Sequence, residues 1–117
     1  MDYMTASEVL QQVDTLLPNQ YTTEQKLHWL HRAEGFAATF AGGTLPKEMT
    51  QTTALAVRAP FSELYRHYVE AQIHYCNGEL ERYNNAIALW NGLLMGWRDY
   101  RLHAGELSEG AAALKLC

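Results

Sequence analysis

The chain has 117 residues, of which 48% are hydrophobic and 19% are charged, and its net charge at pH 7 is −4. This length suits a single domain, and the composition excludes an intrinsically disordered chain. Residues 1–58 carry four basic and six acidic side chains and residues 59–117 carry five and seven, so neither half has the clustered positive charge that binding to a nucleic-acid backbone requires.

The first predicted helix begins after Thr5. Thr5 and Glu8 have the spacing of a capping box, in which the hydroxyl accepts from the Glu8 amide and the Glu8 carboxylate accepts from the Thr5 amide. Pro18 is expected to end this helix. Between them, apolar residues recur at helical spacing: Val9, Leu10, Val13, Leu16 and Leu17.

A second helix is predicted after a short connector at residues 18–21. Thr22 or Thr23 caps it, and Gln25 completes a second capping box with Thr22. Gly42-Gly43 ends it, because glycine accepts the positive φ that a helix C-terminus often needs. Its apolar positions are Leu27, Leu30, Ala33, Ala37 and Phe40, flanked by Trp29 and Phe36.

Residues 42–60 have no helical pattern, although residues 53–57 have the composition of one short strand. A connection of this length is usually either functional or mobile, and the sequence leaves both open. The residues that mark it as a candidate mobile loop are Gly42, Gly43, Pro46 and Pro60.

From Phe61 onward the apolar pattern is strongly helical, and its phase continues across Asn77-Gly78 as far as Trp97. We therefore expect one long helix over about residues 61–102, with a kink at Gly78. The alternative is two antiparallel helices hinged at residues 77–78.

The predicted fold is all-α, a small helical bundle with an irregular loop at about residues 42–60. Two short helices pack on one long helix, or on a helix pair. Residues 1–103 form this helical domain, and residues 104–117 form a C-terminal tail.

Catalysis and metal binding have little support. The sequence holds no GxSxG, P-loop, GxGxxG or HExxH motif, so we expect no catalytic residues and no cofactor. Two groups have metal-ligand spacing, namely Glu24, His28 and His31, and Glu63, His67, Glu70 and His74. The second group lies opposite the apolar stripe and is expected to face water, whereas metal sites of helical bundles face inward. We therefore expect no metal site.

The two cysteines, Cys76 and Cys117, are interpreted as reduced thiols of a cytosolic protein, with a terminal disulfide as the alternative. Cys76 is expected in the core. No signal peptide and no membrane-spanning run is apparent.

Protein–protein contact is the favoured role. A long helix paired with two short ones leaves apolar and aromatic surface uncovered, and Tyr, Trp and Arg are the residues that interfaces favour. We expect an oligomer whose candidate interface residues are Tyr65, Tyr68, Arg82, Tyr83, Trp90, Trp97 and Arg98.

Several segments between residues 6 and 102 resemble a family of small proteins from siphophage genomes that are identified as head–tail connector (adaptor, head-completion) proteins. The most specific are Asn77-Gly78-Glu79 and Arg82-Tyr83-Asn84-Asn85-Ala86. The others are residues 17–21, 26–30, 59–65, 68–73 and 89–91. The tail after His103 lies outside the resemblance.

The resemblance implies a structural virion protein of the neck, made in the cytoplasm of the bacterial host. It implies a ring of about a dozen copies that binds the portal protein after DNA packaging, extends the DNA channel and supports the next neck protein. DNA would pass through without sequence-specific binding. Leu114 and Leu116 of the tail would be candidate anchors in the portal. The alternatives are a small phage protein that binds a host protein, as inhibitors and antitoxins do, and a DNA-packaging accessory subunit.

Overall fold

The structure is a computed structural model and describes residues 3–105. Over this range the chain forms four α-helices and no strand, so the predicted all-α class is confirmed. The elements are α1 (Ala6–Leu16), α2 (Thr23–Ala41), α3 (Glu63–Cys76) and α4 (Leu80–His103). The predicted tail, with Leu114, Leu116 and Cys117, lies outside the described residues.

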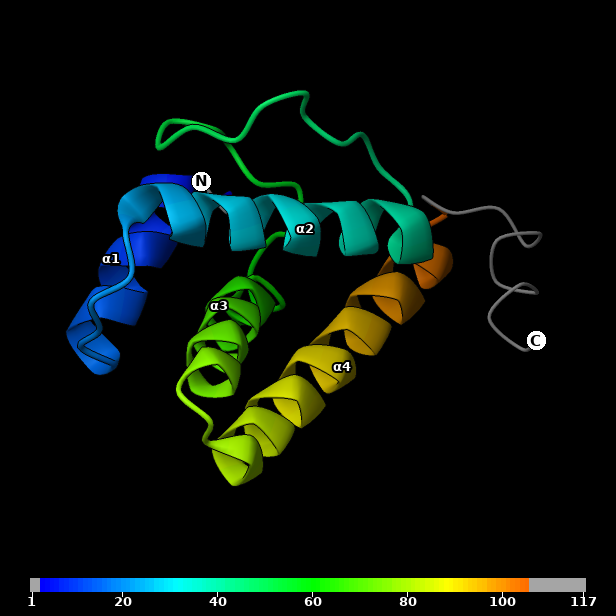
Figure 1. Ribbon diagram of the computed structural model, residues 1–117. Helices are drawn as coiled ribbons and strands as arrows, with labels where there is room; N and C mark the ends of the chain where they lie inside the picture. Colours follow the sequence, from blue (N-terminus) through cyan, green and yellow to red (C-terminus); the bar gives the residue numbers. More distant parts are fainter. Residues whose placement is uncertain (1–2, 106–117) are drawn as a thin grey trace.

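The helices pack as a hairpin with two further helices laid against it. In Figure 1, α3 and α4 meet at the bottom and diverge upward, and α2 crosses above both of them. The α3–α4 pair makes the most extensive contact between described helices, while α1 packs on α2 and α3. The two short helices therefore lie on a helix pair.

The expected single helix over residues 61–102 is wrong, and the alternative of two antiparallel helices is correct. Gly78 adopts φ +77°, and the chain reverses there through a Schellman motif. In this motif the Glu79 amide donates to the His74 carbonyl at 2.9 Å and the Gly78 amide to the Tyr75 carbonyl at 3.1 Å. Both helices of a hairpin face the same core, so an unbroken apolar phase does not distinguish them from one long helix.

The first two helices begin as their sequences predict. Thr5 caps α1 and Thr22 caps α2, each as part of a complete capping box. At its other end α2 stops at Gly42, which has φ +81°. Local hydrogen bonding at the caps thus fixes the boundaries of both helices.

The irregular segment between α2 and α3 runs past α2 (Figure 1) and places two side chains in the core. Leu55 and Val57 are fully buried. The strand expected at residues 53–57 is reduced to a single antiparallel bridge between Thr5 and Ala54. The segment is therefore attached to the bundle along part of its length.

The four residues that mark the candidate mobile loop lie at its two ends and at one contact with α2. Arg101 donates to the Gly42 carbonyl at 2.7 Å, and His31 Nε2 lies 2.8 Å from the Pro46 carbonyl. Gly43 follows with φ +131°, and Pro60 follows a cis peptide bond. Mobility of this loop stays a prediction.

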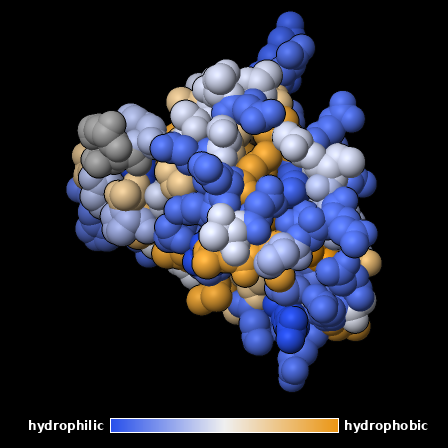
Figure 2. Space-filling model, turned by 90° about the vertical axis from the view of Figure 1, so that its left-hand side faces the viewer, coloured by the Kyte–Doolittle hydropathy of each residue, from blue (hydrophilic) through white to orange (hydrophobic). Residues whose placement is uncertain are grey.

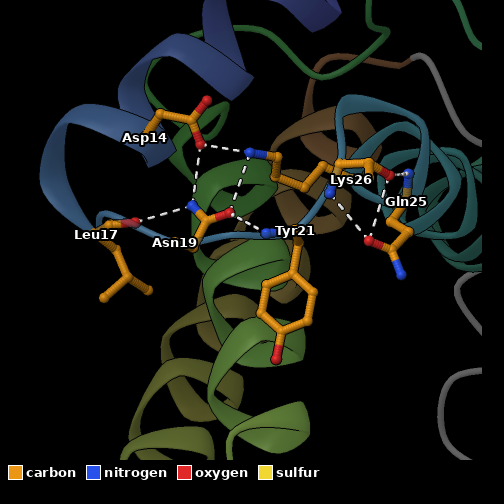
Figure 3. A network of polar contacts seen from close by, with 7 residues as sticks. Asp14, Leu17, Asn19, Tyr21, Gln25 and Lys26 are labelled. Carbon is orange, nitrogen blue, oxygen red and sulfur yellow. Dashed lines mark hydrogen bonds and ion pairs between the residues drawn. The ribbon is translucent and has the colours of Figure 1, made fainter.

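A polar network joins α1 to α2 across their connector (Figure 3). The Lys26 ammonium is buried and lies 2.7 Å from an Asp14 carboxylate oxygen and 3.1 Å from the Asn19 side-chain oxygen. Asn19 also donates to Asp14 at 3.0 Å and accepts from the Tyr21 amide at 3.1 Å. The hydroxyl of Tyr21 donates to Asn77 at 2.6 Å, which ties this connector to the α3–α4 turn.

Two expectations about the end of α3 are wrong. Cys76 is exposed and not in the core. His74 is buried, although its stripe was expected to face water, and its Nδ1 lies 2.8 Å from Glu79. The reason is the hairpin: the chain turns back at residues 77–79, so the side of α3 that holds His74 meets the turn.

Candidate functional site

An open groove of about 890 Å³ lies among α2, α3 and α4. Each helix contributes residues three or four positions apart, which is the spacing of one helix face. The lining residues are Arg32, Phe36, Thr39 and Phe40 of α2, Tyr68, Gln72 and Tyr75 of α3, and Tyr83, Ile87, Trp90, Asn91, Leu94 and Met95 of α4. Three apolar stripes from separate helices thus converge on one hollow.

Aromatic rings form the walls of the groove. The ring of Tyr68 lies between those of Phe36 and Trp90, with centres 6.1 and 4.9 Å away. Nearer the hairpin turn, Tyr75 and Tyr83 pair at 5.4 Å. Such pairs add rigidity to a surface because each ring is held by its neighbour.

Large apolar side chains of the groove remain open to solvent. Phe36 is 51% exposed, Tyr75 is 59% exposed and Met95 is 46% exposed. Water contact with this much adjacent apolar area is unfavourable. Exposed apolar grooves are common at protein interaction sites, so this groove is the candidate binding surface of the described chain.

The formal charge of the described groove lining is positive. Arg32 carries its one formal charge, and no described lining residue carries a carboxylate. Behind one wall, the Arg98 guanidinium lies 3.9 Å from the centre of the Phe40 ring. Arg98 is 2% exposed, and its Nε and Nη2 have no hydrogen-bond partner in the part of the chain that the structure describes. The described lining of the groove therefore carries positive charge and no negative charge, within a chain whose net charge is −4.

The predicted interface residues divide into two sets. Tyr68, Tyr83 and Trp90 line the groove, and Arg82 is exposed nearby with its guanidinium 3.9 Å from Glu79. Tyr68 and Trp90 are also core residues, at 3% and 5% exposure, so they contribute little open surface to the groove. The three predicted residues that do not line the groove are buried as well: Tyr65, Trp97 and Arg98.

Trp97 has a packing role. Its ring stacks near that of Tyr100, with centres 5.9 Å apart, and lies 5.9 Å from that of Phe61. The guanidinium carbons of Arg58 and Arg101 lie 5.2 and 5.6 Å from its centre. These contacts join the loop before α3 to the last turns of α4.

Several groove residues were not predicted, chiefly Arg32, Phe36 and Met95. A sequence signal for α2 existed, because Phe36 lies beside the main apolar stripe and one turn before Phe40, which belongs to that stripe. An apolar face that is wider than one packing partner can cover predicts a second contact surface.

The residues with metal-ligand spacing are used in other contacts. Glu63 and Glu70 both pair with Arg66, at 3.0 and 3.2 Å. His28 and His31 line a separate shallow hollow of about 600 Å³. Over residues 3–105 no group of three His, Cys, Asp or Glu side chains is placed to hold a metal ion.

Exposed apolar side chains also occur on the α1 side of the molecule. Figure 2 views the side at the left of Figure 1, where α1 lies, and shows hydrophobic residues gathered between hydrophilic ones. Leu16 of α1 is 61% exposed, and it shares with Met4 a hollow of about 520 Å³ between α1 and α3 whose other lining residues are polar or charged. This side therefore combines a few exposed apolar side chains with a mostly polar surface.

Comparison of the chain with family models, with curated proteins and with solved structures found no match. Among the described helices, none is both long enough and apolar enough to cross a membrane.

Proposed function

We propose that this protein is a structural component of a siphophage particle, a head–tail connector that binds the portal as a ring of about a dozen copies. It extends the DNA channel and supports the next neck protein, and it is not an enzyme. The observation that carries the proposal is the open, preformed apolar groove among α2, α3 and α4. A subunit whose work is protein contact needs such a surface.

A ring also needs contacts between its subunits, and each subunit contacts its neighbours through two different faces, since the contacts are head-to-tail. The exposed Leu16 on the α1 side is one candidate for such a contact, apart from the α2 and α4 walls of the groove, although α3 lines both hollows.

The segments that carry the resemblance to siphophage connectors support the proposal through their structural roles. Asn77-Gly78-Glu79 forms the turn between α3 and α4. Residues 17–21 form the connector between α1 and α2, and Tyr21 in this connector is hydrogen-bonded to Asn77 of that turn. Both are positions where the fold depends on particular residues, so a shared pattern there is consistent with a shared fold.

Quantitative mass spectrometry of purified virions tests the proposal. A copy number close to that of the portal protein is expected, because one symmetric ring on another has matched subunits or nearly so. Absence from mature particles would overturn it. Recovery from infected cells in complex with a host protein would favour the second candidate, a host-directed inhibitor, which would use the same apolar groove.

A further inference from the structure

The groove among α2, α3 and α4 has the shape and chemistry to hold a helix. Its α4 wall runs from Tyr83 to Met95, a length of about 18 Å at 1.5 Å per residue. All three walls are ridges of side chains at helical spacing, and such ridges accept the ridges of another helix. Amphipathic helices bind grooves of this kind through apolar side chains one turn apart.

The charges around the groove select the partner. Arg32 lies in its lining without a carboxylate beside it in the described residues. The buried Arg98 lies behind Phe40, and within residues 3–105 two of its nitrogens have no hydrogen-bond partner. A buried charge without a counter-ion acts strongly across low-dielectric surroundings. A partner carboxylate at the edge of the groove would meet this positive field.

We propose that the groove binds an acidic amphipathic helix of another protein. Apolar side chains of that helix pack against Phe36, Tyr75 and Met95, which are each about half exposed in the unoccupied groove. A carboxylate one or two turns along the helix pairs with Arg32. Naming this partner chemistry rests on the proposed function, because the same groove is the contact surface in both.

The test uses the full-length protein and two labelled synthetic helices of about 18 residues, both with leucine on one face. One peptide has glutamate on its polar face, and its matched control has lysine there. Fluorescence anisotropy measures binding at low and high salt. We expect the acidic peptide to bind about tenfold more tightly than the basic one at low salt, with a smaller difference at high salt. The opposite preference would be expected from the net charge of −4 alone.

Two pairs of variants locate the binding. Phe36→Ser is compared with Leu89→Ser, since both side chains are exposed to a similar extent, 51% and 54%, and Leu89 lies outside the groove. Arg32→Glu is compared with Lys47→Glu, which makes the same change of charge at a separate hollow. We expect Phe36→Ser to weaken binding about tenfold and Arg32→Glu to weaken it about fivefold. Each control should change binding less than about twofold.

Equal binding of the two peptides, or equal effects of Phe36→Ser and Leu89→Ser, would overturn the proposal. So would sedimentation showing that the chain associates with itself through Phe36, because the occupant would then be a second copy. Circular dichroism of each variant excludes loss of folding as the cause. These measurements use isolated protein, so a failure here leaves the copy number in the virion as a separate test of the proposed function.

Discussion

The hydroxyl of Tyr65 donates a hydrogen bond of 2.5 Å to the Glu34 carboxylate in the interior of the protein. The same hydroxyl accepts from the Val57 amide at 2.8 Å, and Glu34 accepts from the Ala56 amide at 2.8 Å. Both side chains are buried, at 0% and 2% exposure. This pair connects α2, α3 and the irregular segment between them, because buried backbone amides need an acceptor.

Removing the Tyr65 hydroxyl should destabilise the fold. Tyr65→Phe leaves the Val57 amide without its acceptor and removes one of the two donors to Glu34. We expect the free energy of unfolding to fall by about 2 kcal/mol, the usual cost of unsatisfied buried polar groups. Urea denaturation measures it. Tyr75→Phe is the control, since Tyr75 is 59% exposed, and it should change stability by less than about 0.5 kcal/mol. Equal effects of the two variants would contradict the role assigned to the pair.

The stability contribution of Glu34 should decline as the pH rises. Burial raises the pKa of Glu34, and the hydrogen bonds from Tyr65 and Ala56 oppose part of this shift. The folded state therefore binds the proton more tightly than the unfolded chain, whose glutamate pKa is about 4.3. The folded state gains fully from this proton below that pH and loses the gain as the pH rises through the raised pKa.

Comparison of the wild type with Glu34→Gln isolates this effect. The stability difference, wild type minus variant, should be largest below about pH 4.3 and decrease as the pH rises through the raised pKa of Glu34. Glu79 provides a control of opposite sign, because its hydrogen bond from His74 lowers the pKa of Glu79. For Glu79→Gln the same difference should be present near neutrality and be lost as the pH falls through that lowered pKa. Parallel profiles for the two variants would contradict the assignment.

Substitution of Gly78 distinguishes a hairpin from a continuous helix by the sign of its effect on stability. At φ +77° an alanine is strained, so Gly78→Ala should destabilise the hairpin by about 1 kcal/mol. In one long helix the same change would stabilise, because alanine is the better helix former. Gly92→Ala is the matched control inside α4, where a Cβ meets no neighbour within 4 Å, and it should stabilise by about 0.5–1 kcal/mol. Thermal unfolding followed by circular dichroism measures both variants.

Local chemistry made the helix boundaries at Thr5, Thr22 and Gly42 predictable, since each depends on contacts within one turn. The hairpin at Gly78 was harder to predict, because apolar periodicity indicates which residues face a core and does not indicate whether the chain reverses direction. Of the predicted interface residues, Tyr68, Tyr83 and Trp90 line the groove, and their contact with a partner stays a prediction. Tyr68 and Trp90 are core residues, as are Tyr65 and Trp97, because which apolar side chains remain exposed depends on how far the neighbouring helices reach.

We propose that a phage particle needs this protein, and its groove, where head and tail join. The direct test is to delete the gene from the phage, to supply wild type, Phe36→Ser or Leu89→Ser in trans, and to count tailed particles by electron microscopy. Without the protein we expect heads that lack tails, with full restoration by the wild type and Leu89→Ser and little by Phe36→Ser. Normal numbers of tailed particles without the protein would contradict the account.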